Sequence, residues 1–173
     1  MPRKRDTDKV VAVVRDAGGT IVGRTRLQKT AYLLELAGLG EGFHFSYRHY
    51  GPYSEELASA VRDANALGML SEEERPAVWG GLYSVFTVPE VAPGDEVDRS
   101  RIRLVREAAA ASAIELELAA TAAFLANRGS RVPWGDTAKF KAGKARDGRL
   151  ENAKMLYRSL QQIGTPKPLP PIA

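Results

Sequence analysis

The segment FHFSYRHYGPYSEELASAV, residues 43–61, constrains the fold of this chain more than any other. It contains both histidines and five of the thirteen aromatic residues. Aromatic and polar residues alternate over residues 43–47, and a period of two is typical of a strand with its aromatic side chains directed inward. Glycine and proline within residues 50–53 indicate a turn. Ser54 and the two glutamates after it then indicate the start of a capped helix.

Helical periodicity surrounds this segment. Apolar residues recur at helical spacing over residues 10–17, before a pair of glycines. A second helix is expected to open at Thr25, which has the spacing of a capping box with Gln28. The third helix, after Ser54, has an apolar face formed by Leu57, Val61, Ala64 and Leu67, and a glycine ends it.

Two further strands are expected after the third helix. Met69-Leu70 and residues 82–88 are the candidates, and the polar segment SEEERPAVWGG between them is typical of a loop. The order helix, helix, strand, helix and hairpin resembles a winged helix. The sequence therefore predicts a mainly α, α+β chain with a winged-helix-like module and a small β-hairpin over residues 7–88.

The second half of the chain is expected to be helical. Residues 89–99 have the composition of a linker, and residues 100–163 are expected to contain a long alanine-rich helix, from about 100 to 127, and a shorter last helix. Residues 131–149 are basic and irregular. The proline-rich tail, residues 164–173, is expected to be disordered, with a polyproline ligand as the alternative.

The long helix is expected to associate with a partner. One apolar stripe, which includes Ile102 and Val105, can pack on the N-terminal module. A second line of Ile114, Leu118 and Leu125 would remain for a protein partner or for a second copy of the chain.

Composition narrows the function. The chain has no cysteine, which excludes disulfides, thiolate zinc sites and a cysteine nucleophile, and which fits a cytoplasmic location. Two glutamates, Glu115 and Glu117, interrupt the most apolar stretch, so no membrane span is expected. A net charge of +4 permits contact with nucleic acid without requiring it.

Catalysis and metal binding are not expected. His44 and His49 could join Glu55 or Glu56 around a metal ion, but strand residues an odd number apart point to opposite faces. A nucleophilic pair of Ser54 and His49 is equally disfavoured, because helix capping already explains the serine. Neither a nucleophile elbow nor a phosphate-binding loop is present. We therefore expect no enzyme activity, no cofactor and no metal.

Nucleic-acid binding is the main competing function. The candidate contacts are basic residues from two parts of the chain: Arg24, Arg26, Lys29, Lys139, Lys141 and Lys144. The helix that would enter the major groove, however, carries Glu55, Glu56 and Asp63 against Arg62 alone. Phosphates repel such a helix, which disfavours the standard mode of binding DNA.

Two short motifs carry a family resemblance. GRTRLQKTAYLLELAG, followed by YRHYGPYSEEL and ALGML, resembles the YwgA-like and Panacea (SocA-like, GepA-like) group of bacterial and phage proteins. The resemblance covers residues 20–70, and the positions that match the shared motif are Gln28, Lys29, Tyr50, Gly51 and Pro52. It implies a small helical or winged-helix-like module without known catalysis. For the Panacea members it also implies antitoxin and adaptor roles exerted by binding a protein.

The sequence thus predicts a non-enzymatic cytoplasmic binding protein, antitoxin-like or regulatory. Its expected partner is a protein, either a toxin or regulatory target or a second copy held through the long helix. A winged-helix DNA-binding transcriptional regulator is the alternative. Arg48, His49 and Tyr53 are the candidate interaction surface, because their polar groups are not needed to close the turn.

Overall fold

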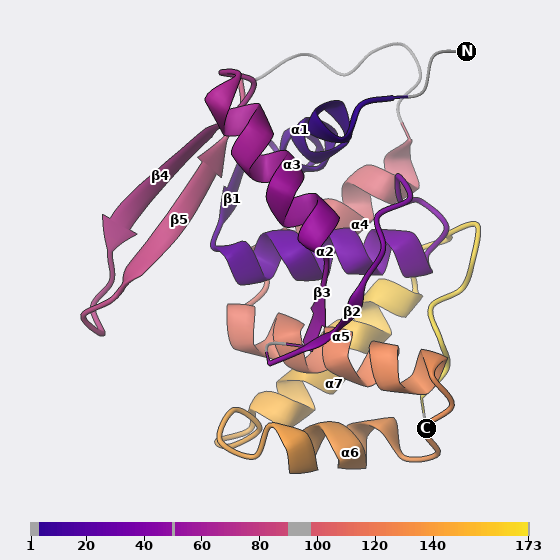
Figure 1. Cartoon of the computed structure of the whole chain (residues 1–173). Helices are drawn as coiled ribbons and strands as arrows, with labels where there is room; N and C mark the ends of the chain where they lie inside the picture. The colour runs from indigo at the N-terminus through magenta and orange to yellow at the C-terminus, as the bar shows by residue number, and fades with distance from the viewer. Residues whose placement is uncertain (1–3, 50, 90–97, 173) are drawn as a thin grey trace.

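The computed structural model describes residues 4–49, 51–89 and 98–172, and its fold mixes helices with small antiparallel sheets. Helix α2 (Arg24–Leu36) runs across the middle of the molecule, with other elements packed on both sides (Figure 1). The predicted α+β class is confirmed. Residues 90–97, the centre of the expected linker, lie outside the described residues.

Helix α1 (Asp6–Asp16) has the predicted buried face of valines. Gly18 and Gly19 follow with φ of 101° and 100°, a region that glycine occupies without strain, and lead into strand β1 (Thr20–Val22). Strand β1 was not predicted, because three residues are too few to show a period of two.

Helix α2 begins after Gly23, and no side chain of the described residues caps it. The predicted capping box of Thr25 and Gln28 is therefore wrong. Gln28 instead lies buried, and its amide bonds to the backbone of Ser54. All residues from 27 to 34 are buried, so α2 lies at the centre of the core.

Strands β1, β5 (Leu82–Thr87) and β4 (Ser71–Pro76) form a sheet in the order β1-β5-β4. The acidic segment SEEERP, predicted to be a loop, is thus a strand. It lies at the edge of the sheet, where charged side chains keep their contact with water and discourage pairing with another strand. Figure 1 shows β4 and β5 extending away from the body, and we call this pair the projecting hairpin.

Strands β2 (Ser46–Arg48) and β3 (Gly51–Tyr53) form a second antiparallel pair, here called the inner hairpin. The predicted turn is therefore itself a strand. Phe43 is buried and Phe45 is half-buried, but Tyr47 is exposed, so the predicted inward direction holds only for the two phenylalanines.

Helix α3 (Glu55–Ala66) begins as predicted, since the Ser54 hydroxyl accepts a hydrogen bond of 3.1 Å from the Leu57 N–H group. Val61 and Ala64 are buried with Leu57. Leu67 lies past the last turn and is exposed, so the predicted apolar face ends one turn early.

The expected long helix is two helices, α4 (Arg99–Ala110) and α5 (Ala113–Asn127). Ala111 is extended, with ψ of 160°, and its carbonyl oxygen accepts a 2.8 Å hydrogen bond from Arg26 Nε. This contact satisfies a carbonyl that would otherwise continue the helix. The basic segment 131–149, expected to be irregular, contains helix α6 (Pro133–Phe140), and helix α7 (Arg149–Gln161) is the predicted last helix.

The free apolar line predicted on the long helix is largely covered in the structure. Leu118, placed on the free line, is fully buried, as are the alanines around it. Helix α5 packs against α2, β3, α6 and α7, and the other two residues of the predicted line, Ile114 and Leu125, are half-buried. Because Leu118 is fully buried, we expect Leu118→Glu to destabilise the fold itself.

The proline-rich tail is ordered through residue 172, which corrects the expectation of disorder. The Lys167 N–H group donates to the carbonyl of Ala37, the Tyr157 hydroxyl donates to the carbonyl of Pro170, and Leu169 is buried. Among the described helices, none is long and apolar enough to span a membrane.

Candidate functional site

Gln28 holds the end of the inner hairpin through its amide. Its Oε1 accepts a 2.8 Å hydrogen bond from the Ser54 N–H group, and its Nε2 donates to the Ser54 carbonyl at 3.0 Å. Both residues are buried, so a side chain without both groups would leave backbone polar atoms unpaired, at about 1–3 kcal/mol. The glutamine of the shared motif thus has a structural role.

Lys29 holds the strand that precedes Ser54. Its Nζ donates to the Pro52 carbonyl at 3.0 Å, and the residue is only 1% exposed. Gly51 lies beside it with φ of 87°, and a Cβ at this position would be 2.6 Å from Thr121 Oγ1 on helix α5. The Leu-Gln-Lys and Tyr-Gly-Pro motifs therefore meet in space. Tyr50, the remaining motif position, lies outside the described residues.

Two more lysines pair with Glu117 on helix α5, and one of them, Lys141, also reaches the inner hairpin. Lys141 Nζ donates to the His49 carbonyl at 2.9 Å and lies 3.3 Å from Glu117 Oε2, while Lys144 Nζ lies 2.7 Å from the same oxygen. Glu117 is 2% exposed. We call Lys29, Glu117, Lys141 and Lys144 the buried polar cluster.

The cluster disfavours the charged form of one of its members. Burial lowers the pKa of Lys29 from 10.5 to about 8; Glu117 opposes this shift, and the charges of Lys141 and Lys144 add to it. The neutral amine can still donate to the Pro52 carbonyl. Deprotonation of Lys29 therefore removes a buried charge without removing its hydrogen bond.

Stability should consequently depend on pH through Lys29. The unfolded chain, with its lysine pKa near 10.5, binds more protons than the folded chain between about pH 8 and 10, so this site adds stability as pH rises. In this pH window, we expect the free energy of unfolding of wild type to rise by about 1 kcal/mol per pH unit relative to that of Lys29→Met. Urea unfolding of both proteins measures the difference, and a difference that stays constant or falls with pH would contradict the pKa shift.

The predicted nucleic-acid contacts do not form one surface. Lys29 and Lys141 are buried, so phosphates cannot reach them and their assignment is wrong. Lys144 is half-buried and bonds to Glu117. Lys139 is exposed, but it belongs to helix α6, which Figure 1 places at the opposite end of the molecule from helices α1 and α3.

Arg24 and Arg26 lie near the projecting hairpin and already have partners. Arg24 Nη2 lies 2.9 Å from Glu72 Oε2, while Arg26 donates to the carbonyls of Ala111 and Val22. The hydrogen bond that Arg24 donates to the Glu72 carboxylate raises the pKa of Arg24.

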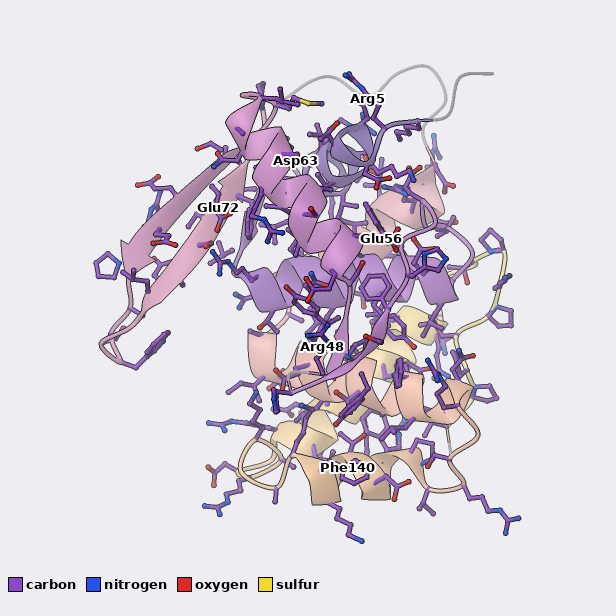
Figure 2. All side chains as sticks on the ribbon, in the orientation of Figure 1. Arg5, Arg48, Glu56, Asp63, Glu72 and Phe140 are labelled. Carbon is purple, nitrogen blue, oxygen red and sulfur yellow. The ribbon has the colours of Figure 1, made fainter. Side chains whose placement is uncertain are left out.

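The predicted interaction residues lie on the outer side of the inner hairpin. Arg48 and His49 are exposed, and Tyr53 is half-buried. Figure 2 shows Arg48 at the level between helices α3 and α5. Its Nη2 lies 3.1 Å from Glu55 Oε1, and its guanidinium carbon lies 5.7 Å from the centre of the Tyr53 ring. The three residues are thus accessible, but the Arg48 guanidinium also lies over the Tyr53 ring.

A second surface was not predicted. A groove of about 810 Å³ lies between the projecting hairpin and the start of helix α2. Its lining includes Val22, Arg24, Arg26, Val78, Trp79 and Leu82, and we call it the lateral groove. Trp79 is 75% exposed and Leu82 is 61% exposed. The sequence signal was a valine and a tryptophan before two glycines, in a segment interpreted only as a loop.

In the described ranges, no group of three or more His, Asp or Glu side chains could hold a metal ion. His44 Nδ1 instead lies 2.8 Å from Glu56 Oε1. The hydrogen bond from the His44 backbone is the main cause that lowers the pKa of Glu56.

The chain is similar to the uncharacterized protein YwgA of Bacillus subtilis strain 168, with 36% identity over 64 residues. The match covers 37% of this chain and 38% of YwgA, so it supports a YwgA-like relationship for about a third of each protein. Searches with protein-family models and with solved structures gave no match.

Proposed function

We propose that the chain is a non-enzymatic cytoplasmic binding protein, antitoxin-like or regulatory, whose lateral groove contacts a protein partner. We further propose that its N-terminal part is winged-helix-like. The order α1, β1, α2, α3, β4, β5 with the sheet order β1-β5-β4 supports this, with the inner hairpin inserted before α3. The antitoxin-like role rests on the resemblance of the two motifs to the Panacea group.

One observation carries the proposal: large apolar side chains are exposed beside the groove. Val78 and Trp79 are at the tip of the projecting hairpin, and Leu82 begins its second strand. Exposed apolar surface next to a concave site marks binding, and tryptophan and arginine dominate the energetics of protein interfaces. Arg24, which is paired with Glu72, lines the groove together with Arg26 and Glu74, so the charges of the groove nearly balance and a mainly apolar partner segment fits it.

DNA binding is the second candidate, because the same topology occurs in winged-helix regulators. The charge of α3 opposes it: Glu56 and Asp63 lie along this helix in Figure 2. Strand β4, beside it, contributes three more glutamates. Any affinity for a DNA duplex should therefore be independent of sequence and fall steeply with salt.

Site-specific photo-cross-linking tests the proposal. A photoreactive amino acid replaces Trp79 in one protein and Met155, another exposed apolar residue, on helix α7, in a second protein. After irradiation of the producing cells, we expect a discrete protein adduct at position 79 and none at position 155. Adducts of nucleic acid at position 79, or the same adducts at both positions, would contradict the proposal.

A further inference from the structure

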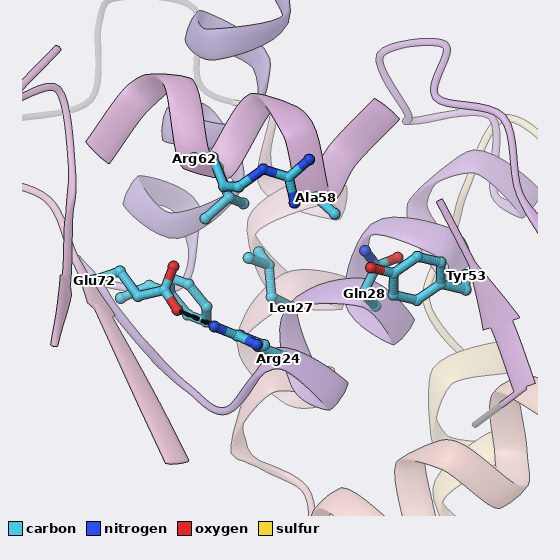
Figure 3. Close-up of a pocket in the computed structure, with 9 residues that line it drawn as sticks. Arg24, Leu27, Gln28, Tyr53, Ala58, Arg62 and Glu72 are labelled. Carbon is cyan, nitrogen blue, oxygen red and sulfur yellow. Dashed lines mark hydrogen bonds and ion pairs between the residues drawn. The ribbon is translucent and has the colours of Figure 1, made fainter. Parts of the chain in front are cut away.

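A small pocket lies next to the lateral groove, between helices α2 and α3 and strands β3 and β5. Its volume is about 120 Å³. Leu27, Val61 and Phe86, all buried core residues, provide its apolar floor. Figure 3 shows this pocket with Arg62 above it, Arg24 below it, Glu72 at one side and Tyr53 at the other.

Polar donors without partners converge on this pocket. The Arg62 guanidinium and the Tyr53 hydroxyl make no hydrogen bond or ion pair with the described residues. In Figure 3 the guanidinium extends over the pocket, and the hydroxyl end of Tyr53 is directed towards it. Gln28 also lines the pocket, but the Ser54 backbone occupies both ends of its amide.

The charges around the pocket select the ligand. Glu72 is neutralised by Arg24 at 2.9 Å, and the same carboxylate oxygen, Oε2, accepts a hydrogen bond of 2.7 Å from Ser84. Arg62 then provides one positive charge in excess. A monoanion balances this charge, whereas a phosphate dianion would leave a negative charge near Glu72.

We propose that this pocket binds a carboxylate attached to a small branched apolar group. The apolar group packs on Leu27, Val61 and Phe86, and the carboxylate accepts hydrogen bonds from Arg62 and Tyr53. The carboxylate comes either from a free small acid or from the C-terminus of a peptide. Because Arg24 lines both this pocket and the lateral groove, the ligand also lies next to the proposed protein-binding surface.

Nuclear magnetic resonance titration of the full chain tests this proposal. The probes are 3-methylbutanoate, its neutral amide, and a short peptide ending in leucine with either a free or an amidated C-terminus. We expect the two carboxylates to shift the signals of residues around the pocket at millimolar concentration. The two amides should bind with an affinity at least about fivefold lower. If 3-methylbutanoate binds, a free small acid is sufficient as the ligand. If only the peptide with the free C-terminus binds, the ligand is the C-terminus of a peptide.

Matched variants complete the test. Arg62→Gln should weaken carboxylate binding at least about fivefold, whereas Arg106→Gln, which removes an exposed arginine from helix α4, should not change it. Ala58→Met should fill the pocket and abolish binding while the protein remains folded. The proposal is overturned if neither carboxylate binds, if the amides bind equally well, or if the two arginine variants behave alike.

Discussion

Gly51→Val is expected to lower the free energy of unfolding by about 3 kcal/mol or more. Two costs combine: a side chain at φ of 87° is strained, and its Cβ would lie 2.6 Å from the buried Thr121 Oγ1. Urea unfolding measures the loss. His49→Ala is the control from the same hairpin, and because its side chain is exposed we expect a change within about 0.5 kcal/mol.

A double-mutant cycle separates the two costs at Gly51. Gly51→Ala is compared in wild type and in Thr121→Ala, which removes the hydroxyl that the new Cβ would meet. The substitution should cost less in Thr121→Ala, and the remaining cost is the backbone strain. Equal costs in both backgrounds would show that the close contact with helix α5 does not restrict this position.

Glu117→Ala is expected to destabilise the protein by about 3–5 kcal/mol. The change leaves Lys141, whose side chain is 4% exposed, without the carboxylate that neutralises it. Glu151→Ala removes an exposed glutamate that pairs with Lys154 on helix α7, and should cost less than about 0.5 kcal/mol. Chemical denaturation of both variants provides the comparison.

The charge explanation of the Glu117 effect has its own test. Adding Lys141→Met to Glu117→Ala removes the more buried of the two charges that lose their carboxylate, so the double variant should be more stable than Glu117→Ala alone. A double variant less stable than Glu117→Ala would contradict the explanation and would point to packing around α5 as the origin.

Features set by neighbouring residues were predictable from the sequence. The cap at Ser54, the buried face of α1 and the last helix, α7, all depend on side chains within a few positions of one another. The sequence identifies the Leu-Gln-Lys and Tyr-Gly-Pro motifs, but it does not predict that they lie in contact. Gln28 bonds to Ser54 across 26 positions, and no local spacing encodes such a contact.

Features set by distant contacts could not be predicted. The break at Ala111 interrupts a run of alanines with high helix propensity, and it depends on Arg26, which is 85 positions away. Strand β4 is rich in glutamate, and only its place at the edge of the sheet makes this composition acceptable. Lys141 and Glu117 look like surface charges in the sequence because their burial results from the packing of the inner hairpin on helix α5.

The proposed function is tested most directly by the affinity of the chain for the protein that cross-links to position 79. Calorimetric titration compares wild type with Trp79→Ser and with Met155→Ser, which removes a similarly exposed side chain from helix α7. We expect Trp79→Ser to weaken binding at least about tenfold and Met155→Ser to remain within about twofold of wild type. Equal affinities of wild type and Trp79→Ser would contradict the assignment of the lateral groove as the protein-binding surface.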